Sequence, residues 1–289
     1  IADFESNWDA CANKLFYLAV PPESYGDILK HMEEAGLHLP CGPSDWTKLV
    51  IEKPFGRDEE SAKDLNQKLI KLFTESQIYR IDHYLGKDGV MALQLLNQPE
   101  KIKRISVRLW ETMTVAGRGS FYETVGALRD VGQNHLLTIF TILTGLPANK
   151  LELVSSTRAQ YVGYCEVPDV ATNSQVETYF KIVAKLNDGA WQGVEFIFES
   201  GKAMPEIKKE VVIEYKNERE ETLPLELNKY SQYVAEYEQL ILDAINGERK
   251  RFLSEEEVET AWQFIDPIIR DWEENKVPLT TYRPGTLPA

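Results

Sequence analysis

The first 80 or so residues constrain the fold most, because short apolar runs alternate there with helical segments. Strands are predicted at Lys14 to Val20, Lys48 to Ile51 and Gln77 to Ile81, with helices near 25–35 and 58–74 between them. Strands joined by helical crossovers pair in parallel, because each crossover returns the chain to the same end of the sheet. This part of the chain is therefore predicted to form a parallel α/β sheet.

The remainder of the chain groups its strands and helices instead of alternating them. Strands are predicted at 105–112 and near 176–185, 193–199 and 210–215, and helices at 87–96, 126–143, 230–246 and 254–274. Segregated elements favour an antiparallel sheet with helices on one face. The predicted fold class is therefore α/β followed by α+β, with residues 1–81 as the first domain and 82–289 as the second.

Charge and composition exclude several classes of function. The net charge of −14 and pI of about 4.9 argue against nucleic-acid binding, which needs a concentrated basic surface. No apolar run approaches the ~20 residues of a membrane span, and no signal segment opens the chain, so we expect a cytoplasmic protein without a membrane partner. Cys11, Cys41 and Cys165 have no paired or metal-ligand spacing, so we expect reduced, buried thiols and no metal.

The densest polar cluster runs from Arg80 to Lys87, where a predicted strand ends and a helix begins. Ligands bind at this position in open α/β sheets. His83 and Lys87 are four residues apart, so they would share a face if the helix starts here, and the helix start would attract an anion. The cluster therefore suits a phosphate, although its spacing alone favours a solvated helix start with a packed tyrosine.

A second polar cluster, residues 129–135, interrupts an apolar helix. His135 lies about 140° around an ideal α-helix from Asp130, so a common ligand would need a cleft or a bent helix. A histidine facing Asp82 would form a carboxylate–imidazole pair with one ring nitrogen left as a general base. An ordinary amphipathic helix with a hydrogen-bonded histidine is the alternative.

Two further candidates carry a lysine at the end of a strand. Lys53 precedes Pro54, whose peptide bond could be cis, although a surface turn explains the pair as well. Gly201-Lys202 closes another predicted strand and is a weak signal by itself.

Taken together, these segments resemble the glucose-6-phosphate dehydrogenase family. The run from Tyr79 to Lys87, YRIDHYLGK, is close to a family signature, and the matches follow the family's order over almost the whole chain. The other matching stretches are FYLAVPP at 16–22, EKPFGRD at 52–58, RD at 129–130 with QNHLL at 133–137, GKA at 201–203, EYEQLILD at 236–243 and YRPGT at 282–286.

The resemblance implies oxidation of β-D-glucose 6-phosphate to 6-phosphoglucono-1,5-lactone with NADP⁺ as hydride acceptor, the first oxidative step of the pentose phosphate pathway. It implies that His135 is the general base for the C1 hydroxyl and that Asp82 orients His135. The implied substrate-binding residues are His83, Tyr84 and Lys87 for the phosphate, Lys202 as a further cation, and Lys53, Glu111 and Asp130 for sugar hydroxyls. The implied cofactor-binding residues are Pro21, Pro22, Tyr25, Lys53 and Pro54.

The sequence departs from the family at two places. No stretch matches the glycine-rich turn that receives the coenzyme's pyrophosphate, and Gly117-Arg118-Gly119 follows a different strand. We therefore expect the second half of a Rossmann-type doubly wound parallel sheet, with its first strand at an edge and NADP binding impaired. This suggests a truncated product, or an edge covered by another chain or segment.

The second departure lies near 215–230, where the family carries more sheet strands. The larger domain is expected to have a mainly antiparallel sheet packed on helices, through which the family forms homodimers. That sheet also holds a second, structural NADP⁺ in some members.

Two alternatives to a working dehydrogenase remain at this level. A non-catalytic glucose 6-phosphate binding fragment or pseudoenzyme fits the missing turn, and we expect little turnover from this chain alone. A related sugar-phosphate reductase would keep the Glu-Lys-Pro stretch but lack the YRIDHYLGK run.

Overall fold

The computed structural model describes residues 11–95, 98–226 and 233–288. The chain folds into two compact units, one of residues 1–86 with 233–258 and one of residues 87–232 with 259–289. Sequence reasoning places 233–258 with the larger domain, whereas in the structure this segment packs on the first sheet. We describe each unit by itself.

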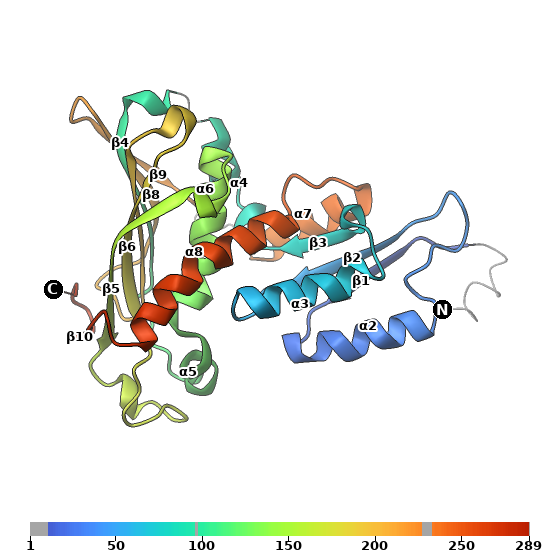
Figure 1. Cartoon of the computed structure of the whole chain (residues 1–289), viewed down its shortest axis with the longest axis horizontal. Helices are drawn as coiled ribbons and strands as arrows, with labels where there is room; N and C mark the ends of the chain where they lie inside the picture. The colour runs from blue at the N-terminus through green and yellow to red at the C-terminus, as the bar shows by residue number, and fades with distance from the viewer. Residues whose placement is uncertain (1–10, 96–97, 227–232, 289) are drawn as a thin grey trace. The chain divides into compact units, whose positions relative to one another are not determined.

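The smaller unit is built on a parallel sheet in the order β1-β2-β3, counted over the described residues. Its strands are β1 (Lys14–Leu18), β2 (Thr47–Glu52) and β3 (Ile78–Ile81), as predicted. The crossovers contain α2 (Tyr25–Glu34) and α3 (Glu59–Ile70), which run along the sheet in Figure 1. Asp58 caps α3 by accepting a hydrogen bond of 2.8 Å from the Ser61 N–H.

A helix from late in the sequence covers this sheet. Helix α7 (Tyr233–Asn246) and the segment after it share an apolar cluster with the strands. The rings of Tyr79 and Phe252 meet edge to face with centroids 4.8 Å apart. The cluster comprises Val50, Tyr79, Ile81, Leu240, Ala244 and Phe252. Burying this apolar surface on the strands places residues 233–258 in the smaller unit.

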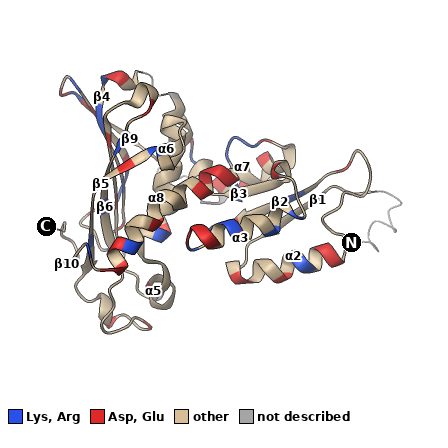
Figure 2. Ribbon diagram, in the orientation of Figure 1, with Lys and Arg blue, Asp and Glu red and all other residues tan. Residues whose placement is uncertain are grey.

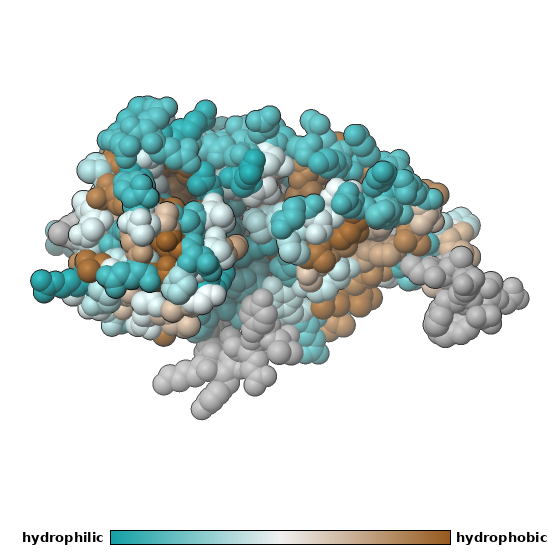
Figure 3. All heavy atoms as spheres, turned by 90° about the horizontal axis from the view of Figure 1, so that it is seen from below, coloured by the Kyte–Doolittle hydropathy of each residue, from teal (hydrophilic) through white to brown (hydrophobic). Residues whose placement is uncertain are grey.

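The first strand lies at the edge of its sheet, as expected. Within the described residues, no further strand pairs with the outer side of β1, whereas β3 is bridged on its outer side by Leu253. Apolar surface remains nearby, since Tyr17 on β1 is 39% exposed and Ile70 is 50% exposed. Brown apolar surface also gathers over this unit in Figure 3. An open edge beside apolar surface favours cover by further protein.

Within the described residues, the larger unit contains a mixed sheet in the order β10-β5-β6-β7-β4-β8-β9. The strand order gives antiparallel pairs except for β4 with β7 and β10 with β5. The strands are β4 (Ile102–Trp110), β5 (Leu151–Tyr161), β6 (Tyr179–Leu186), β7 (Val194–Gly201), β8 (Lys208–Tyr215), β9 (Glu220–Pro224) and β10 (Leu279–Tyr282). The predicted α/β plus α+β class is confirmed, although β5, β9 and β10 were not predicted.

Helices pack on one side of this sheet in Figure 1. They are α4 (Asp88–Met91), α5 (Gly119–Ala127), α6 (Leu137–Thr144) and the C-terminal part of α8 (Glu255–Glu273). The ring of Phe140 on α6 meets those of Phe196 and Phe198 on β7 at 5.1 and 6.1 Å. Acidic residues begin α3 and α8 in Figure 2, where they complement the helix dipole. None of the described helices is long and apolar enough to cross a bilayer.

The prediction of a single helix over 126–143 is wrong. The segment consists of α5, a π-helix over Leu128–Leu136 and then α6. The break falls at Gly126, whose φ of 66° and ψ of 177° lie outside the helical region. Backbone hydrogen bonds in a π-helix join residue i to i+5, so residues five apart follow one another on one side.

The expectation of reduced, buried cysteines is also wrong for two of the three. Cys11 and Cys41 are exposed and form a disulfide, whereas Cys165 is free. The parallel register of Lys14 with Thr47 brings together the segments that precede β1 and β2, and these segments carry the two cysteines.

The disulfide predicts a thiol count. Alkylation of the denatured protein without reductant should label one cysteine, and alkylation after reduction should label all three. Intact-mass measurement distinguishes these products. Three labels without reductant would contradict the disulfide.

Candidate active site

In the smaller unit, a pocket of about 530 Å³ lies at the carboxyl ends of the three parallel strands. This is where open α/β sheets bind ligands. The pocket brings together Pro21, Lys53 and His83, each of which the sequence indicated as a site residue. The remaining lining residues are Tyr17, Ala19, Val20, Glu52 and Tyr237. Lys53 and His83 supply groups that can bind an anion or a sugar hydroxyl.

Glu52 connects the segments that line this pocket through its hydrogen bonds. Its carboxylate accepts hydrogen bonds from the hydroxyls of Tyr17 and Tyr237, and the Tyr25 hydroxyl donates to its carbonyl at 2.9 Å. Burial raises the pKa of Glu52, the two tyrosine hydrogen bonds oppose this, and Asp82 raises it further. Burial and the charge of Glu52 raise the pKa of Tyr25 to about 12. Through its hydrogen bond to the Glu52 carbonyl, the Tyr25 hydroxyl supports the end of β2.

The other predicted cofactor-side residues flank the pocket. Pro22 begins a short 3₁₀ turn, Pro22–Ser24, that leads into α2. The peptide bond between Lys53 and Pro54 is cis, one of the two arrangements that the sequence allowed. Pro22 and Pro54 thus lie in the two connections that supply Pro21 and Lys53 to the pocket, and Tyr25 is the first residue of α2.

Asp82 is fully buried at the end of β3 and fixes the turn that follows it. Its carboxylate accepts a hydrogen bond of 3.0 Å from the Tyr84 N–H, and its carbonyl accepts one of 2.9 Å from the Leu85 N–H. The turn, His83–Gly86, is a 3₁₀ helix in which the His83 and Tyr84 rings lie 4.9 Å apart. The aspartate therefore holds His83 at the pocket rim.

Two neighbours fix the same turn from the other side. The Arg251 guanidinium donates a hydrogen bond of 3.0 Å to the Leu85 carbonyl. A Cβ at Gly86 would come within 3.0 Å of the Glu236 carbonyl oxygen, so this position suits glycine where α7 passes. The turn is therefore set by packing as well as by its own hydrogen bonds.

Arg80, the second residue of the YRIDHYLGK run, has a structural role. Arg80 is 2% exposed, and its guanidinium donates hydrogen bonds of 2.7 Å to Glu75 and 2.6 Å to Asn66 on α3. These contacts tie β3 to α3 and to the turn before the strand. The run therefore combines a framework residue with the polar residues of the site.

His83 and Lys87 do not share the face of one helix, which corrects the sequence expectation. The 3₁₀ helix ends at Gly86, and Lys87 is extended with φ of −83° and ψ of 123° before α4 begins. In the larger unit the Lys87 ammonium is 3.0 Å from Glu226, which also pairs with Lys209 at 2.7 Å. Burial alone would raise the pKa of Glu226, but the two lysines lower it overall.

The π-helix carries Asp130 and His135, which are five residues apart. Because hydrogen bonds in a π-helix join residue i to i+5, these two side chains lie on the same side of the helix. The angle of about 140° that an α-helix would place between them therefore does not apply here. His135 is buried and Asp130 half-buried. A Cβ at Gly132 would lie 3.0 Å from the Phe180 ring on β6, so glycine allows the π-helix to pack closely on the sheet.

A charged pair lies at the ends of two parallel strands in the larger unit. The Lys202 ammonium is 2.8 Å from the Glu111 carboxylate and 5.8 Å from the centre of the Tyr122 ring. Burial and then the charge of Asp130 raise the pKa of Tyr122 well above its usual value, and Glu111 contributes too. The structure thus gathers Glu111, Asp130 and Lys202 around one buried tyrosine.

The backbone of Lys202 is held by two further residues. Its N–H donates to the Thr178 carbonyl at 2.9 Å, and its carbonyl accepts a hydrogen bond of 2.6 Å from the Tyr282 hydroxyl. Tyr282 begins the YRPGT stretch. The late stretch therefore supports a lysine 80 residues earlier.

Sequence reasoning missed several residues of these sites. Tyr17, Glu52 and Tyr237 line the pocket of the smaller unit, and Tyr122 and Glu226 contact the lysines of the larger unit. Tyr17, Glu52 and Tyr237 all lie in stretches that resemble the family, which was the available signal. Asp82 belongs to one unit and His135 to the other, so their pairing stays a prediction.

Two family models together match residues 1–288 of the chain. One described as "Glucose-6-phosphate dehydrogenase, NAD binding domain" matches residues 1–92. Another described as "Glucose-6-phosphate dehydrogenase, C-terminal domain" matches residues 91–153, 148–234 and 219–288. The resemblance drawn from the short stretches is confirmed.

Similar proteins agree with these models. The glucose-6-phosphate 1-dehydrogenase of Helicobacter pylori (strain ATCC 700392 / 26695) is 31% identical over 93% of this chain and 72% of its own length. That of Drosophila melanogaster is 30% identical over 95% of this chain and 68% of its own. The Arabidopsis thaliana protein named "Glucose-6-phosphate 1-dehydrogenase 6, cytoplasmic" is 27% identical over 98% of this chain and 68% of its own.

Solved structures show the same architecture. The crystal structure of glucose-6-phosphate 1-dehydrogenase from Mycobacterium avium has a TM-score of 0.80 and 27% identity, and the match covers 99% of this chain and 75% of that one. A glucose-6-phosphate dehydrogenase in complex with its substrate has a TM-score of 0.84 and 25% identity, over 100% of this chain and 75% of that one.

Proposed function

Since this chain belongs to the glucose-6-phosphate dehydrogenase family of oxidoreductases, we propose that it oxidises β-D-glucose 6-phosphate to the 1,5-lactone and transfers the hydride to NADP⁺. The observation that carries the proposal is the pocket at the carboxyl ends of the parallel strands. It places Lys53 and His83, from two stretches typical of the family, in one cavity. The reaction would be the first oxidative step of the pentose phosphate pathway.

In this proposal His135 accepts the proton of the C1 hydroxyl as general base. Asp82, which is buried and already held by the Tyr84 N–H, orients His135 and stabilises its charged form. Removing the hydroxyl proton supplies the electron density that expels hydride from C1.

The substrate would be held by its phosphate and its hydroxyls. His83, Tyr84 and Lys87 bind the phosphate, with Lys202 as a further cation. Lys87 would exchange its contact with Glu226 for the phosphate. Lys53, Glu111 and Asp130 would bind sugar hydroxyls. Fixing both ends of the sugar supplies the orientation that hydride transfer needs.

The coenzyme would lie on the side of the smaller unit. Pro21, Pro22, Tyr25, Lys53 and Pro54 would border the nicotinamide, and Lys53 would contact the sugar as well. Residues 1–81 would thus mainly serve the coenzyme, and residues 82–289 would supply the catalytic residues and the other substrate contacts. By analogy with the cytoplasmic Arabidopsis relative, we place the protein in the cytoplasm. We also propose a homodimer formed through the seven-stranded sheet.

A second candidate function is binding of glucose 6-phosphate without turnover. It is favoured by one observation, that no stretch of the 289 residues matches the glycine-rich turn for the pyrophosphate. Without this turn, the polypeptide would bind NADP⁺ only weakly.

Absorbance at 340 nm with glucose 6-phosphate and NADP⁺ separates the two candidates. The first candidate predicts that NADPH forms, whereas the second predicts little or none from these 289 residues, because the pyrophosphate has no glycine-rich turn to receive it. Calorimetry should still detect weak binding of glucose 6-phosphate. A normal turnover number would exclude the second candidate, and absence of glucose 6-phosphate binding would exclude both.

A further inference from the structure

The start of the π-helix is held by a residue on a different element. Glu177, just before β6, accepts a hydrogen bond of 2.8 Å from the Leu128 N–H with its carboxylate. Its carbonyl accepts one of 3.1 Å from the Ala127 N–H. One residue thus binds two consecutive amides at the point where α5 gives way to the π-helix.

Gly126 makes this close approach possible. A Cβ at Gly126 would lie 2.5 Å from one carboxylate oxygen of Glu177 and 2.8 Å from the other. The φ of 66° at Gly126 also favours glycine. The glycine at the backbone break therefore leaves the room that the Glu177 carboxylate occupies.

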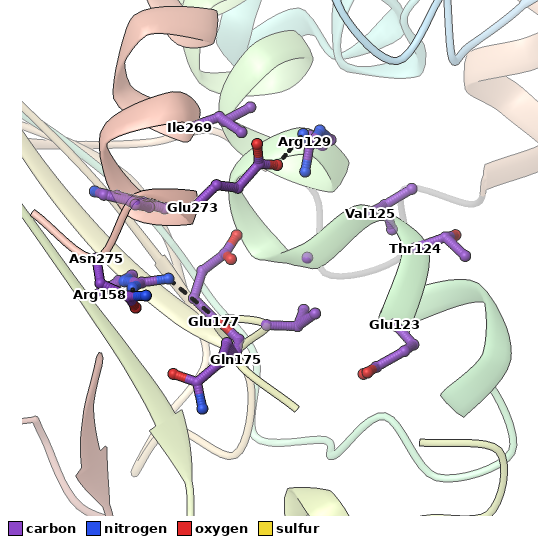
Figure 4. Close-up of a pocket in the computed structure, with 13 residues that line it drawn as sticks. Glu123, Thr124, Val125, Arg129, Arg158, Gln175, Glu177, Ile269, Glu273 and Asn275 are labelled. Carbon is purple, nitrogen blue, oxygen red and sulfur yellow. Dashed lines mark hydrogen bonds and ion pairs between the residues drawn. The ribbon is translucent and has the colours of Figure 1, made fainter. Parts of the chain in front are cut away.

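A cavity of about 190 Å³ borders this contact (Figure 4). Glu177 and Arg158 line one side of it, and Arg129 on the π-helix pairs with Glu273 on α8 at 3.0 Å. The Arg158 guanidinium donates to the carbonyls of Val277 and Gln175. Glu177 itself is buried, so its carboxylate is largely shielded from water.

We propose that Glu177 is a positioning residue, whose carboxylate fixes the start of the π-helix and thereby sets Asp130 for binding the sugar. This rests on the proposed function, in which Asp130 binds a sugar hydroxyl. Asp130 lies two residues after the amide that Glu177 holds. A shift at that amide would move the first turn of the π-helix, because Leu128 is the residue at which this helix begins.

The charge state of Glu177 determines the strength of this contact. Burial raises its pKa, while the Leu128 amide and the charges of Arg129 and Arg158 oppose the rise. A protonated carboxyl is a weaker acceptor than a carboxylate. The titratable groups that face Glu177 or line its cavity are Arg129, Arg158, Tyr122, Tyr164, Glu123 and Glu273.

The experiment compares Glu177→Ala, Glu177→Gln and a control, Glu273→Gln. Glu273 lines the same cavity and pairs with Arg129, yet it is an exposed side chain. Calorimetry should show that Glu177→Ala weakens glucose 6-phosphate binding about tenfold or more, which is the loss of one charge-assisted hydrogen bond. Glutamine keeps an acceptor oxygen, so Glu177→Gln and the control should bind within about threefold of the parent.

A pH series supplies a readout that a purely structural role would not change. Between about pH 8 and about pH 5, the Kd of the parent should rise relative to that of Glu177→Gln, which has no carboxyl to protonate. Substrate and histidine titrations are common to both proteins and cancel in the ratio. A constant ratio, or Glu177→Ala binding like the parent, would overturn the proposal.

A measurement without substrate tests the positioning role of Glu177 independently of the proposed function. The backbone amide resonance of Leu128 should titrate with pH in the parent and stay constant in Glu177→Gln. If the resonance titrates but the parent binds no glucose 6-phosphate, the proposed function fails and the contact stands. If the parent binds but the resonance does not respond to pH, the positioning role fails.

Discussion

Replacing His83 with alanine is expected to abolish detectable binding of glucose 6-phosphate. His83 lines the pocket at the carboxyl ends of the strands and is held there by the turn that Asp82 caps. A charge-assisted hydrogen bond to a phosphate contributes about 2 kcal/mol, so its loss should raise Kd by about 30-fold. Since the parent is expected to bind weakly, calorimetry should then show no saturable heat.

His31→Ala is the matched control, because His31 is exposed on α2 in the same unit and lies outside the pocket. Its Kd should equal that of the parent. Both variants should give the parent's circular dichroism spectrum, which would show that the fold is retained. Unchanged binding by His83→Ala would remove His83 from the phosphate site.

Replacing Gly119 with alanine is expected to destabilise the larger unit by about 3 kcal/mol. A Cβ at this first residue of α5 would lie 2.1 Å from the backbone carbonyl oxygen of Pro168, with Val167 and Val170 at 3.1 Å. Backbone cannot rotate away as a side chain can, so α5 or the loop must shift. The urea midpoint of unfolding, followed by circular dichroism, measures the effect.

Gly117→Ala, two residues earlier, separates crowding from backbone conformation. Gly117 has a φ of 78° but open space where a Cβ would lie. It should cost about 1 kcal/mol through its backbone alone. If the two variants unfold at the same urea concentration, the close contact at Gly119 is not what requires glycine there.

The parallel sheet was predictable because its strands are short apolar runs with helices between them, and β2 and β3 are buried almost throughout. Strand β5 was not, since Glu152 to Ser155 along its first half are exposed and give no alternating pattern. The disulfide depends on the parallel pairing of β1 and β2, which brings together cysteines 30 residues apart. Spacing along a chain does not carry that information.

In the candidate site, too, local motifs were predictable from the sequence, whereas contacts that depend on strand pairing were not. The YRIDHYLGK run indicated Asp82 and His83 because its polar residues follow a strand directly. The pairing of Lys202 with Glu111 required the neighbouring positions of β7 and β4, which no local pattern reveals. Glu177 was missed because a lone glutamate beside a strand resembles any surface carboxylate until its burial is known.

The π-helix has a consequence for how this chain tolerates changes in length. Nine residues close their hydrogen bonds over one more residue than an α-helix does. Deleting Leu136, which lies outside the interval from Asp130 to His135, would allow ordinary helical pairing up to α6, while the break at Gly126 would remain. Asp130 and His135 would still be five residues apart, and on an α-helix that separation is about 140°. The direction of these two side chains therefore depends on the length of this segment as well as on their own identity.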